Sequence, residues 1–193
     1  MTLQVVHCDR VEPQAWRNGG GHTRELLAWP GREDWQLRIS VADIDRDGPF
    51  SPYPGVDRWF AVVEGAGVRL QLPGGAKSID TDSAALQFRG EDAPDSDLLD
   101  GPTRDLNLMV RRGHGPAAMQ RAEPGVDFHP RAALRALFCA DAATLQIDGS
   151  DARVLAPFTL LWSAGGAHGL WRLRSELDRP RAWWMSFQPT DSR

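Results

Sequence analysis

The sequence predicts an all-β protein, either a sandwich or a barrel, and two features of the chain support this prediction. First, apolar and polar side chains alternate with the period of two that is typical of a strand, most clearly over residues 35–41. Second, short apolar, β-branched or aromatic runs recur along the chain, and turn residues separate nearly all of them. This pattern favours hairpins as the local unit.

The predicted strands extend over most of the chain. In residues 35–41 the odd-numbered positions are apolar and the even-numbered positions are polar, so this strand has one apolar side. Further strands are predicted at residues 59–63, 68–72, 84–88, 106–110, 134–139, 144–147, 158–162, 170–173 and 182–187. Only residues 131–138, which are rich in alanine and leucine, could form a helix instead, and their length is marginal for one.

Two irregular stretches interrupt these runs. Residues 89–104 are acidic and contain prolines, which predicts a solvated loop. Residues 123–130 contain further prolines and a glycine, and strand-like runs resume after them. We therefore predict an N-terminal β-unit at residues 1–122 and a C-terminal β-unit at residues 123–193, packed against each other in one compact chain.

The composition is that of an ordinary soluble protein, with 41% hydrophobic and 25% charged residues and a formal net charge of −4. This charge provides no basic surface for nucleic acid or for an anionic membrane, whereas a small anionic ligand remains compatible with local arginines. Neither a secretion signal nor a long apolar span is visible, which predicts a cytoplasmic protein. We expect Cys8 and Cys139 to be buried thiols. Sheet edges would be compatible with a homodimer.

Three successive glycines, at positions 19–21, lie between Trp16 and a polar segment that ends at Glu25. Glycine has no Cβ, so this backbone can adopt positive φ and let another group approach closely. The ordered flanks favour a binding loop over a linker, although a simple tight turn between strands would also explain the glycines. Nucleotide-binding motifs do not fit, because Arg24 occupies the place of the third glycine and no Gly-Lys-Ser/Thr follows.

Two further stretches carry polar groups. Residues 48–58 contain three prolines and two glycines, which fix an irregular loop that presents Phe50 and Ser51. The alternative is a structural corner whose aromatic residues cover the core. In residues 105–111, strand alternation places Asp105 and Asn107 on one face. Alternatively, these two side chains face solvent or bond to backbone groups at a sheet edge.

Together these stretches resemble the HutD family, also known as Ves, whose members carry a Trp-Lys-Asn-Gly-Gly-Gly-x-Thr-Arg-Glu motif. The resemblance covers the first 113 residues, through residues 16–25, 38–42, 48–58 and 105–113 in order. Two positions depart from the family pattern. Arg17 replaces the common lysine, which keeps the charge but not the chemistry of lysine, and Leu106 stands where phenylalanine is frequent.

The resemblance implies a cupin-like β-barrel with a bicupin architecture of the RmlC-like jelly-roll type. It also implies a link to bacterial histidine utilisation. In that pathway the protein would bind an acidic intermediate, N-formyl-L-glutamate or a similar compound, and regulate the pathway. No enzymatic activity is established for the family.

Metal-dependent cupins share a His-x-His-x3-Glu frame on a barrel strand, and the corresponding frame here is Arg58-x-Phe60-x3-Glu64. A guanidinium group and a phenyl ring cannot coordinate a cation. The five histidines, which include His168, show no spacing that would supply other ligands. We therefore expect neither a metal nor another cofactor.

An arginine in a barrel interior suits a carboxylate ligand, because the planar guanidinium can bind both carboxylate oxygens. We predict Arg58 as the main anchor and Arg24 as a second one, with asparagine and serine side chains contacting an amide or formyl group. The residues predicted to bind the ligand are Trp16, Asn18, Arg24, Glu25, Ser40, Phe50, Ser51, Arg58, Asp105 and Asn107.

Two alternatives remain open from the sequence. Each arginine could instead form a structural salt bridge with Glu25, Asp57 or Asp105. The chain could also be a metal-free cupin enzyme of the isomerase or lyase type that acts on a small carboxylate. Such an enzyme would need little more than one acid/base group, for which Glu25, Glu64 and Asp105 are the candidates.

Overall fold

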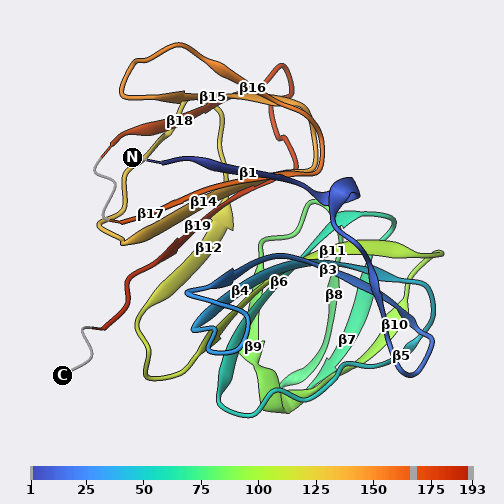
Figure 1. Cartoon of the computed structure of the whole chain (residues 1–193). Coiled ribbons are helices and arrows are strands. Elements are labelled where there is room, and N and C mark those ends of the chain that lie inside the picture. The colour runs from blue at the N-terminus through green and yellow to red at the C-terminus, as the bar shows by residue number, and fades with distance from the viewer. Residues whose placement is uncertain (1, 166–168, 191–193) are drawn as a thin grey trace. The chain divides into compact units, whose positions relative to one another are not determined.

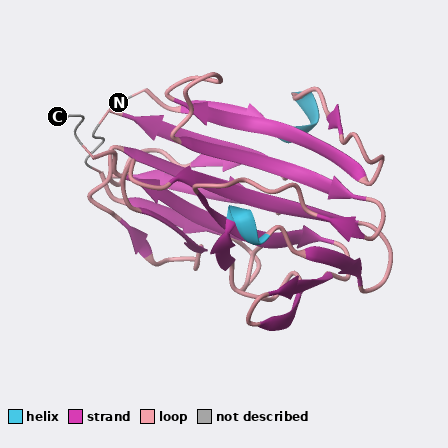
Figure 2. Cartoon of the chain, turned by 90° about the horizontal axis from the view of Figure 1, so that it is seen from below, coloured by secondary structure: helices cyan, strands magenta, loops and turns pink. Residues whose placement is uncertain are grey.

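The computed structural model describes residues 2–165 and 169–190, and nearly all of its regular structure is β-strand (Figure 1). Among these described residues, helix is confined to short 3-10 segments, drawn in cyan in Figure 2. These are the 3-10 helices η1 (Cys8–Arg10) and η2 (Gly90–Asp92). The prediction of an all-β protein is therefore confirmed. Within the described ranges, no helix has the length and apolar character needed to cross a membrane.

The chain divides into two compact units. Val11–His114 forms the N-terminal unit, and Met1–Arg10 together with Gly115–Arg193 forms the C-terminal unit. The sequence predicted a boundary between residues 122 and 123 instead. The difference arises because strand pairing over long distances, which no local pattern encodes, assigns β1 (Gln4–His7) and β12 (Ala117–Arg121) to the C-terminal unit.

The N-terminal unit contains a six-stranded sheet in the order β2-β3-β4-β11-β6-β9 and a four-stranded sheet in the order β5-β10-β7-β8. The strands are β2 (Gln14–Ala15), β3 (Gly21–Trp29), β4 (Leu37–Ile44), β5 (Gly48–Pro49), β6 (Val56–Glu64), β7 (Val68–Leu72), β8 (Gly75–Ile79), β9 (Leu86–Arg89), β10 (Asp95–Leu98) and β11 (Thr103–Arg111). One core cluster joins the sheets, with Phe60 and Val62 from β6 and Val68 and Leu70 from β7.

The two faces of the six-stranded sheet differ in chemistry. We call the face that carries Phe60 and Val62 the inner face, because these side chains join the core cluster shared with the four-stranded sheet. The inner face also carries the polar positions of the strand predicted at residues 35–41. The opposite face carries apolar side chains such as the fully buried Leu37 and Ile39, and also the ion-paired Asp43. The alternation of apolar and polar residues in this strand was therefore predicted correctly. Its polar side chains, however, face the space between the two sheets of the N-terminal unit.

The C-terminal unit also contains two sheets, in the orders β1-β17-β14-β19-β12 and β13-β18-β15-β16. Besides β1 and β12, its strands are β13 (Asp127–Phe128), β14 (Leu134–Cys139), β15 (Ala143–Ile147), β16 (Arg153–Leu155), β17 (Thr159–Ala164), β18 (Trp171–Arg174) and β19 (Ala182–Phe187). Leu137 and Trp184 of the first sheet pack in one cluster with Leu145 and Trp171 of the second. Cys8 and Cys139 are buried and are not joined in a disulfide.

The strand predicted at residues 134–139 is confirmed as β14, which pairs on both sides with β17 and β19, so the helix alternative for residues 131–138 is not realised. One local prediction differs from the structure. The acidic residues 89–104 are only partly a loop, because they contain η2 and β10. In β10 the exposed Asp95 and Asp97 alternate with the buried Ser96. Tertiary pairing overrides local composition in this stretch.

Gly21 begins β3 at a point where the backbones of β3 and β4 approach closely. A Cβ atom at position 21 would lie 2.0 Å from the backbone oxygen of Asp43. That oxygen cannot retreat without disturbing the sheet, so we expect Gly21→Ala to lower the free energy of unfolding by about 1–3 kcal/mol, measured by chemical denaturation.

Gly74→Ala, in the turn between β7 and β8, is the matched control. No atom lies within 4 Å of a Cβ built at Gly74. We expect this variant to change the free energy of unfolding by less than about 0.5 kcal/mol. Equal stability of the two variants would contradict the proposed clash at Gly21.

Candidate functional site

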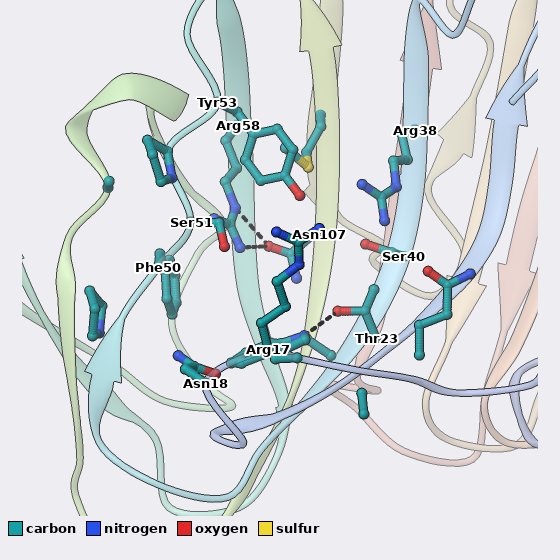
Figure 3. A pocket seen from close by; sticks show the side chains of 18 residues that line it. Arg17, Asn18, Thr23, Arg38, Ser40, Phe50, Ser51, Tyr53, Arg58 and Asn107 are labelled. Atoms are coloured by element: carbon teal, nitrogen blue, oxygen red, sulfur yellow. Dashed lines mark hydrogen bonds between the residues drawn. The ribbon is translucent and has the colours of Figure 1, made fainter. Parts of the chain in front are cut away.

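The N-terminal unit contains a cavity of about 680 Å³. Most of its wall comes from the inner face of the six-stranded sheet and from the two loops that the sequence singled out (Figure 3). The lining residues are Gln14, Ala15, Trp16, Arg17, Asn18, Thr23, Arg38, Ser40, Ala42, Pro49, Phe50, Ser51, Pro52, Tyr53, Arg58, Ala93, Asn107 and Met109. A cavity of this size is in the ordinary range for small-molecule sites.

Strand register arranges the sheet side of the cavity in rows. Met109 of β11 lies opposite Arg38 of β4 on one side and opposite Arg58 of β6 on the other. In the next row, Asn107 lies between Ser40 and Phe60. Residues opposite one another in a sheet project from the same face. The antiparallel register therefore brings two arginines, a serine and an asparagine to one wall.

Arg58 is held by a neutral acceptor. Its Nε and Nη2 atoms donate hydrogen bonds to Asn107 Oδ1 at 2.9 and 2.6 Å. Its guanidinium carbon lies 4.5 Å from the ring centroid of Phe50 and 5.5 Å from that of Phe88, which are cation–π distances. No carboxylate among the described residues bonds to Arg58, so none of them pairs with its charge directly.

Burial is the main reason that the pKa of Arg58 is lowered to about 10. The nearby positive charge of Arg38 acts in the same direction, whereas Tyr53 and Asp105 oppose the shift. A pKa of about 10 still leaves the guanidinium protonated at neutral pH. Arg58 is therefore a partly buried cation at the cavity wall.

The glycine loop forms a second wall. Trp16 N donates to Gly21 O at 2.9 Å, which closes the loop, and Gly19 within it has φ of +68°. The indole Nε1 of Trp16 donates to Thr23 Oγ1 at 2.7 Å, which fixes both side chains at the cavity. Figure 3 shows Arg17 extending from this loop into the cavity.

The proline-rich loop forms the third wall and is anchored by backbone hydrogen bonds. Phe50 N donates to Pro94 O at 3.0 Å, and Tyr53 N donates to Gly90 O at 2.9 Å. These bonds tie the loop to the acidic stretch at residues 89–104, from which Ala93 lines the cavity. Phe50 is only 5% exposed, so it serves the core and the cavity at once.

Among the described residues, all the charged side chains that line the cavity are arginines. Arg17, Arg38 and Arg58 line it, and no aspartate or glutamate of the described chain does. Arg38 is partly neutralised by Glu25, whose Oε2 lies 2.9 Å from Arg38 Nε. The remaining polar lining comes from neutral amide and hydroxyl groups.

Most of the predicted binding residues come together in this cavity. Those that line it are Trp16, Asn18, Ser40, Phe50, Ser51, Arg58 and Asn107. Arg24, Glu25 and Asp105 do not line it. Whether the lining residues bind a ligand stays a prediction.

Arg24 is kept from the cavity by strand alternation. Its neighbour Thr23 faces the cavity, so Arg24 points to the opposite face of the sheet, where it pairs with Asp43. Arg104 also donates to Asp43, at 2.7 Å. Burial alone would raise the pKa of Asp43, but the bonds from Arg104 and Arg24 outweigh it and lower that pKa. Arg24 is therefore a structural ion-pair partner, as the salt-bridge alternative from the sequence expected, but its partner is Asp43 and not Glu25, Asp57 or Asp105.

The carboxylate of Glu25 forms ion pairs, and the side chain of Asp105 is buried. Glu25 pairs with Arg32 at 3.1 Å and with Arg38. Asp105 is fully buried on the inner face, where its Oδ2 accepts a hydrogen bond from Thr103 Oγ1 at 2.8 Å. Its Oδ1 has no hydrogen-bond partner among the described residues.

Several cavity residues were absent from the predicted set, notably Arg17, Arg38, Thr23 and Tyr53. A signal for Arg38 was present, because it lies two positions from Ser40 and thus on the same face of the strand. Arg17 adjoins the predicted Trp16 and Asn18 but was considered only as a lysine replacement. Tyr53 lies in the predicted loop.

The residues at the cavity do not suit a metal ion. In the frame Arg58-x-Phe60-x3-Glu64, Arg58 bonds to Asn107, Phe60 is in the core, and Glu64 lies 3.9 Å from Arg104. Among residues 2–165 and 169–190, no group of three or more histidine, cysteine, aspartate or glutamate side chains could hold a metal. His168 lies outside the described residues.

Solved structures identify the fold. A conserved protein of unknown function from Pseudomonas aeruginosa PAO1 superposes with a TM-score of 0.86 at 28% identity, covering 97% of this chain and 100% of that one. HutD from Pseudomonas fluorescens SBW25 gives a TM-score of 0.85 at 24% identity, covering 98% and 100%. Oxalate decarboxylase from Lactobacillus farciminis gives 0.60 at 11% identity, covering 96% and 86%. The fold and the cavity thus define an all-β, cupin-like protein.

A family model described as HutD matches residues 9–182, and the chain therefore belongs to the HutD family. An uncharacterized 21.2 kDa protein of the hutC 3′ region in Pseudomonas putida is 34% identical over 109 residues, 55% of this chain and 57% of that protein. Protein Ves of Cronobacter sakazakii is 30% identical over 122 residues, 63% of this chain and 67% of Ves. The chain thus spans only part of these relatives. The predicted HutD resemblance is confirmed, and the bicupin architecture stays a prediction.

Asp105 should make the stability of the protein depend on pH. Its burial raises its pKa to about 8, although the hydrogen bond from Thr103 and the charge of Arg58 oppose this shift. The folded state thus holds the proton more tightly than the unfolded chain, in which aspartate titrates near pH 4 (about 3.9). The free energy of unfolding should therefore fall as pH rises from about 4 towards about 8.

Asp105→Asn removes this titration without changing the shape of the side chain. We expect the free energy of unfolding of the variant to decline less with rising pH than that of the wild type, as measured by urea denaturation at several pH values. Asp100→Asn, at an exposed position before β11, is the control and should keep the wild-type pH dependence. Parallel curves for Asp105→Asn and the wild type would contradict the assignment.

Proposed function

We propose that this protein binds a small carboxylate metabolite in the arginine-lined cavity of its N-terminal unit. The observation that carries the proposal is the charge of the lining: Arg17, Arg38 and Arg58 border the cavity, and no acidic residue of the described chain does. A desolvated guanidinium is unfavourable unless an anion compensates it. A carboxylate would do so, since the guanidinium fork matches its two oxygens.

Arg58 is the proposed main anchor. Asn107 and Phe50 hold its side chain in place, so little conformational freedom remains to be lost on binding. Arg38 lies across Met109 from Arg58 and would contribute a second positive charge. Ser40 and Asn107 offer neutral polar groups for an amide or formyl substituent.

N-formyl-L-glutamate is the first compound to test, because the chain belongs to the HutD family and a relative derives from a hutC region. We further propose that binding of this or a similar intermediate regulates histidine degradation. Cytoplasmic location and homodimerisation stay predictions from the sequence.

Binding without turnover is favoured over the enzyme alternative by the position of the acidic residues. Glu25, Glu64 and Asp105 were the candidates for acid/base catalysis, and none of them lines the cavity. Glu25 is engaged by two arginines, and Glu64 is exposed. Consumption of the bound compound by wild-type protein in a turnover assay would support the enzyme alternative instead.

Arg58→Ala should weaken binding of N-formyl-L-glutamate by about 2–5 kcal/mol, measured by isothermal titration calorimetry. The loss arises because the ligand carboxylate would meet no charge at that position. Arg58→Lys should recover only part of the affinity, since an ammonium group keeps the charge but lacks the planar fork and its stacking on Phe50.

Arg46→Ala is the matched control, because Arg46 is exposed in the connection between β4 and β5 and does not line the cavity. Its affinity should equal that of the wild type. Circular dichroism and thermal unfolding would establish that each variant is folded. Equal affinities of folded Arg58→Ala and wild type would rule out Arg58 as the anchor.

A further inference from the structure

A charged side chain is also buried in the C-terminal unit. Arg135 belongs to β14, a strand in which every residue is buried, and it is only 3% exposed. It lies between Leu134 and Ala136, both fully buried. Sequence reasoning did not single it out, because its surroundings are those of an ordinary core strand.

Register places Arg135 between two serines. It lies opposite Ser163 of β17 on one side and opposite Ser186 of β19 on the other. Leu137, two residues further along β14, packs in the core cluster between the two sheets. Since residues two apart share a face, the serine–arginine–serine row also faces the interior of the unit.

Two buried polar atoms of this row have no hydrogen-bond partner among the described residues. Arg135 Nη1 donates to Gly169 O at 2.5 Å, whereas Arg135 Nε has no partner among them. Ser163 is fully buried, and its Oγ also lacks a described partner. Buried polar atoms are normally satisfied, and an unsatisfied pair side by side is typical of a place for a bound ion or water.

Among the residues that the structure describes, no acidic side chain bonds directly to Arg135. Burial lowers its pKa, and the nearby Asp148 opposes this effect. Asp148 Oδ1, however, accepts a hydrogen bond from Leu170 N at 2.7 Å. The carboxylate of Asp127 is also engaged, because Arg172 Nε and Nη2 donate hydrogen bonds to its two oxygens at 2.6 and 2.9 Å. A buried guanidinium without a contacting anion is unfavourable, and a bound anion would compensate it.

A second cavity, of about 360 Å³, adjoins this row. Ser186 belongs to both the row and the cavity wall. Pro130 also lines the cavity, whereas Arg135 and Ser163 do not. Phe128 and Trp184, stacked with ring centroids 4.6 Å apart, form the aromatic part of the wall.

We propose that the C-terminal unit contains a second binding site, for a small monocarboxylate, in which Arg135 binds the carboxylate and Ser163 and Ser186 donate hydrogen bonds to it. A single guanidinium balances one negative charge, so a monoanion fits better than a phosphate dianion. The stacked aromatic rings provide an apolar surface for the rest of the molecule. This site does not depend on the function proposed for the cavity of the N-terminal unit.

Acetate is the probe, and the Nε–H signal of Arg135 is the readout. In full-length protein labelled with nitrogen-15 arginine, Arg135→Met identifies this signal in a proton–nitrogen correlation spectrum by its loss. If Arg135→Met does not fold, Arg135→Lys serves the same purpose. We expect sodium acetate to shift the Arg135 signal saturably, with a midpoint on the order of millimolar, and sodium chloride at equal ionic strength to leave it in place.

Three variants complete the test. Ser163→Ala should weaken the acetate response of Arg135, because one hydrogen-bond donor is lost. Arg153→Met, an exposed arginine on β16, should leave it unchanged. Arg58→Ala should also leave it unchanged, which separates this site from the N-terminal cavity. An Arg135 signal that does not respond to acetate, or that responds equally to chloride, would show that Arg135 only clamps β14 to Gly169 and would overturn the proposal.

Discussion

The N-terminal unit is organised around a partly buried guanidinium whose hydrogen-bond partner is an amide oxygen. Arg58 bonds to Asn107 Oδ1 and lies against Phe50. These contacts fix the position of the guanidinium but do not neutralise its charge. Because the three residues come from β6, β11 and the proline-rich loop, one side chain links the sheet to the loop that closes the cavity. These contacts hold the side chain of Arg58 in place, and its positive charge faces the cavity.

The positive charge of the cavity also depends on the positions and ion-pair partners of the nearby acidic residues. Asp43 is occupied by Arg24 and Arg104 on the opposite face of the sheet, and Glu25 by Arg32 and Arg38. Asp105 is buried, and its raised pKa favours the neutral acid at neutral pH. Apart from Glu25, which partly neutralises Arg38, these carboxylates are thus paired away from the cavity or protonated, which leaves the cavity lining positively charged.

The two units place arginine in a comparable setting by the same means. In each, an interior arginine is flanked in register by residues on neighbouring strands, Met109 beside Arg58 and two serines beside Arg135. In each, one sheet face that would ordinarily be wholly apolar carries a polar row. Core patterning alone does not require such rows, and this is why we propose ligand binding at both arginines.

The sequence by itself determined the strand content, the alternation in β4 and β11, the hairpin turns and the two cavity loops, because these depend on side-chain period and on the backbone preferences of glycine and proline. It also predicted that Arg58, Asn107 and Ser40 lie together, as they do at the cavity wall. Only the tertiary structure decided that Arg38, not Arg24, is the second arginine of the cavity, and that Arg135 lies beside two serines. It alone decided that β1 joins the C-terminal unit. Inter-strand register sets these neighbours, and register arises from pairing between distant segments that no local pattern records.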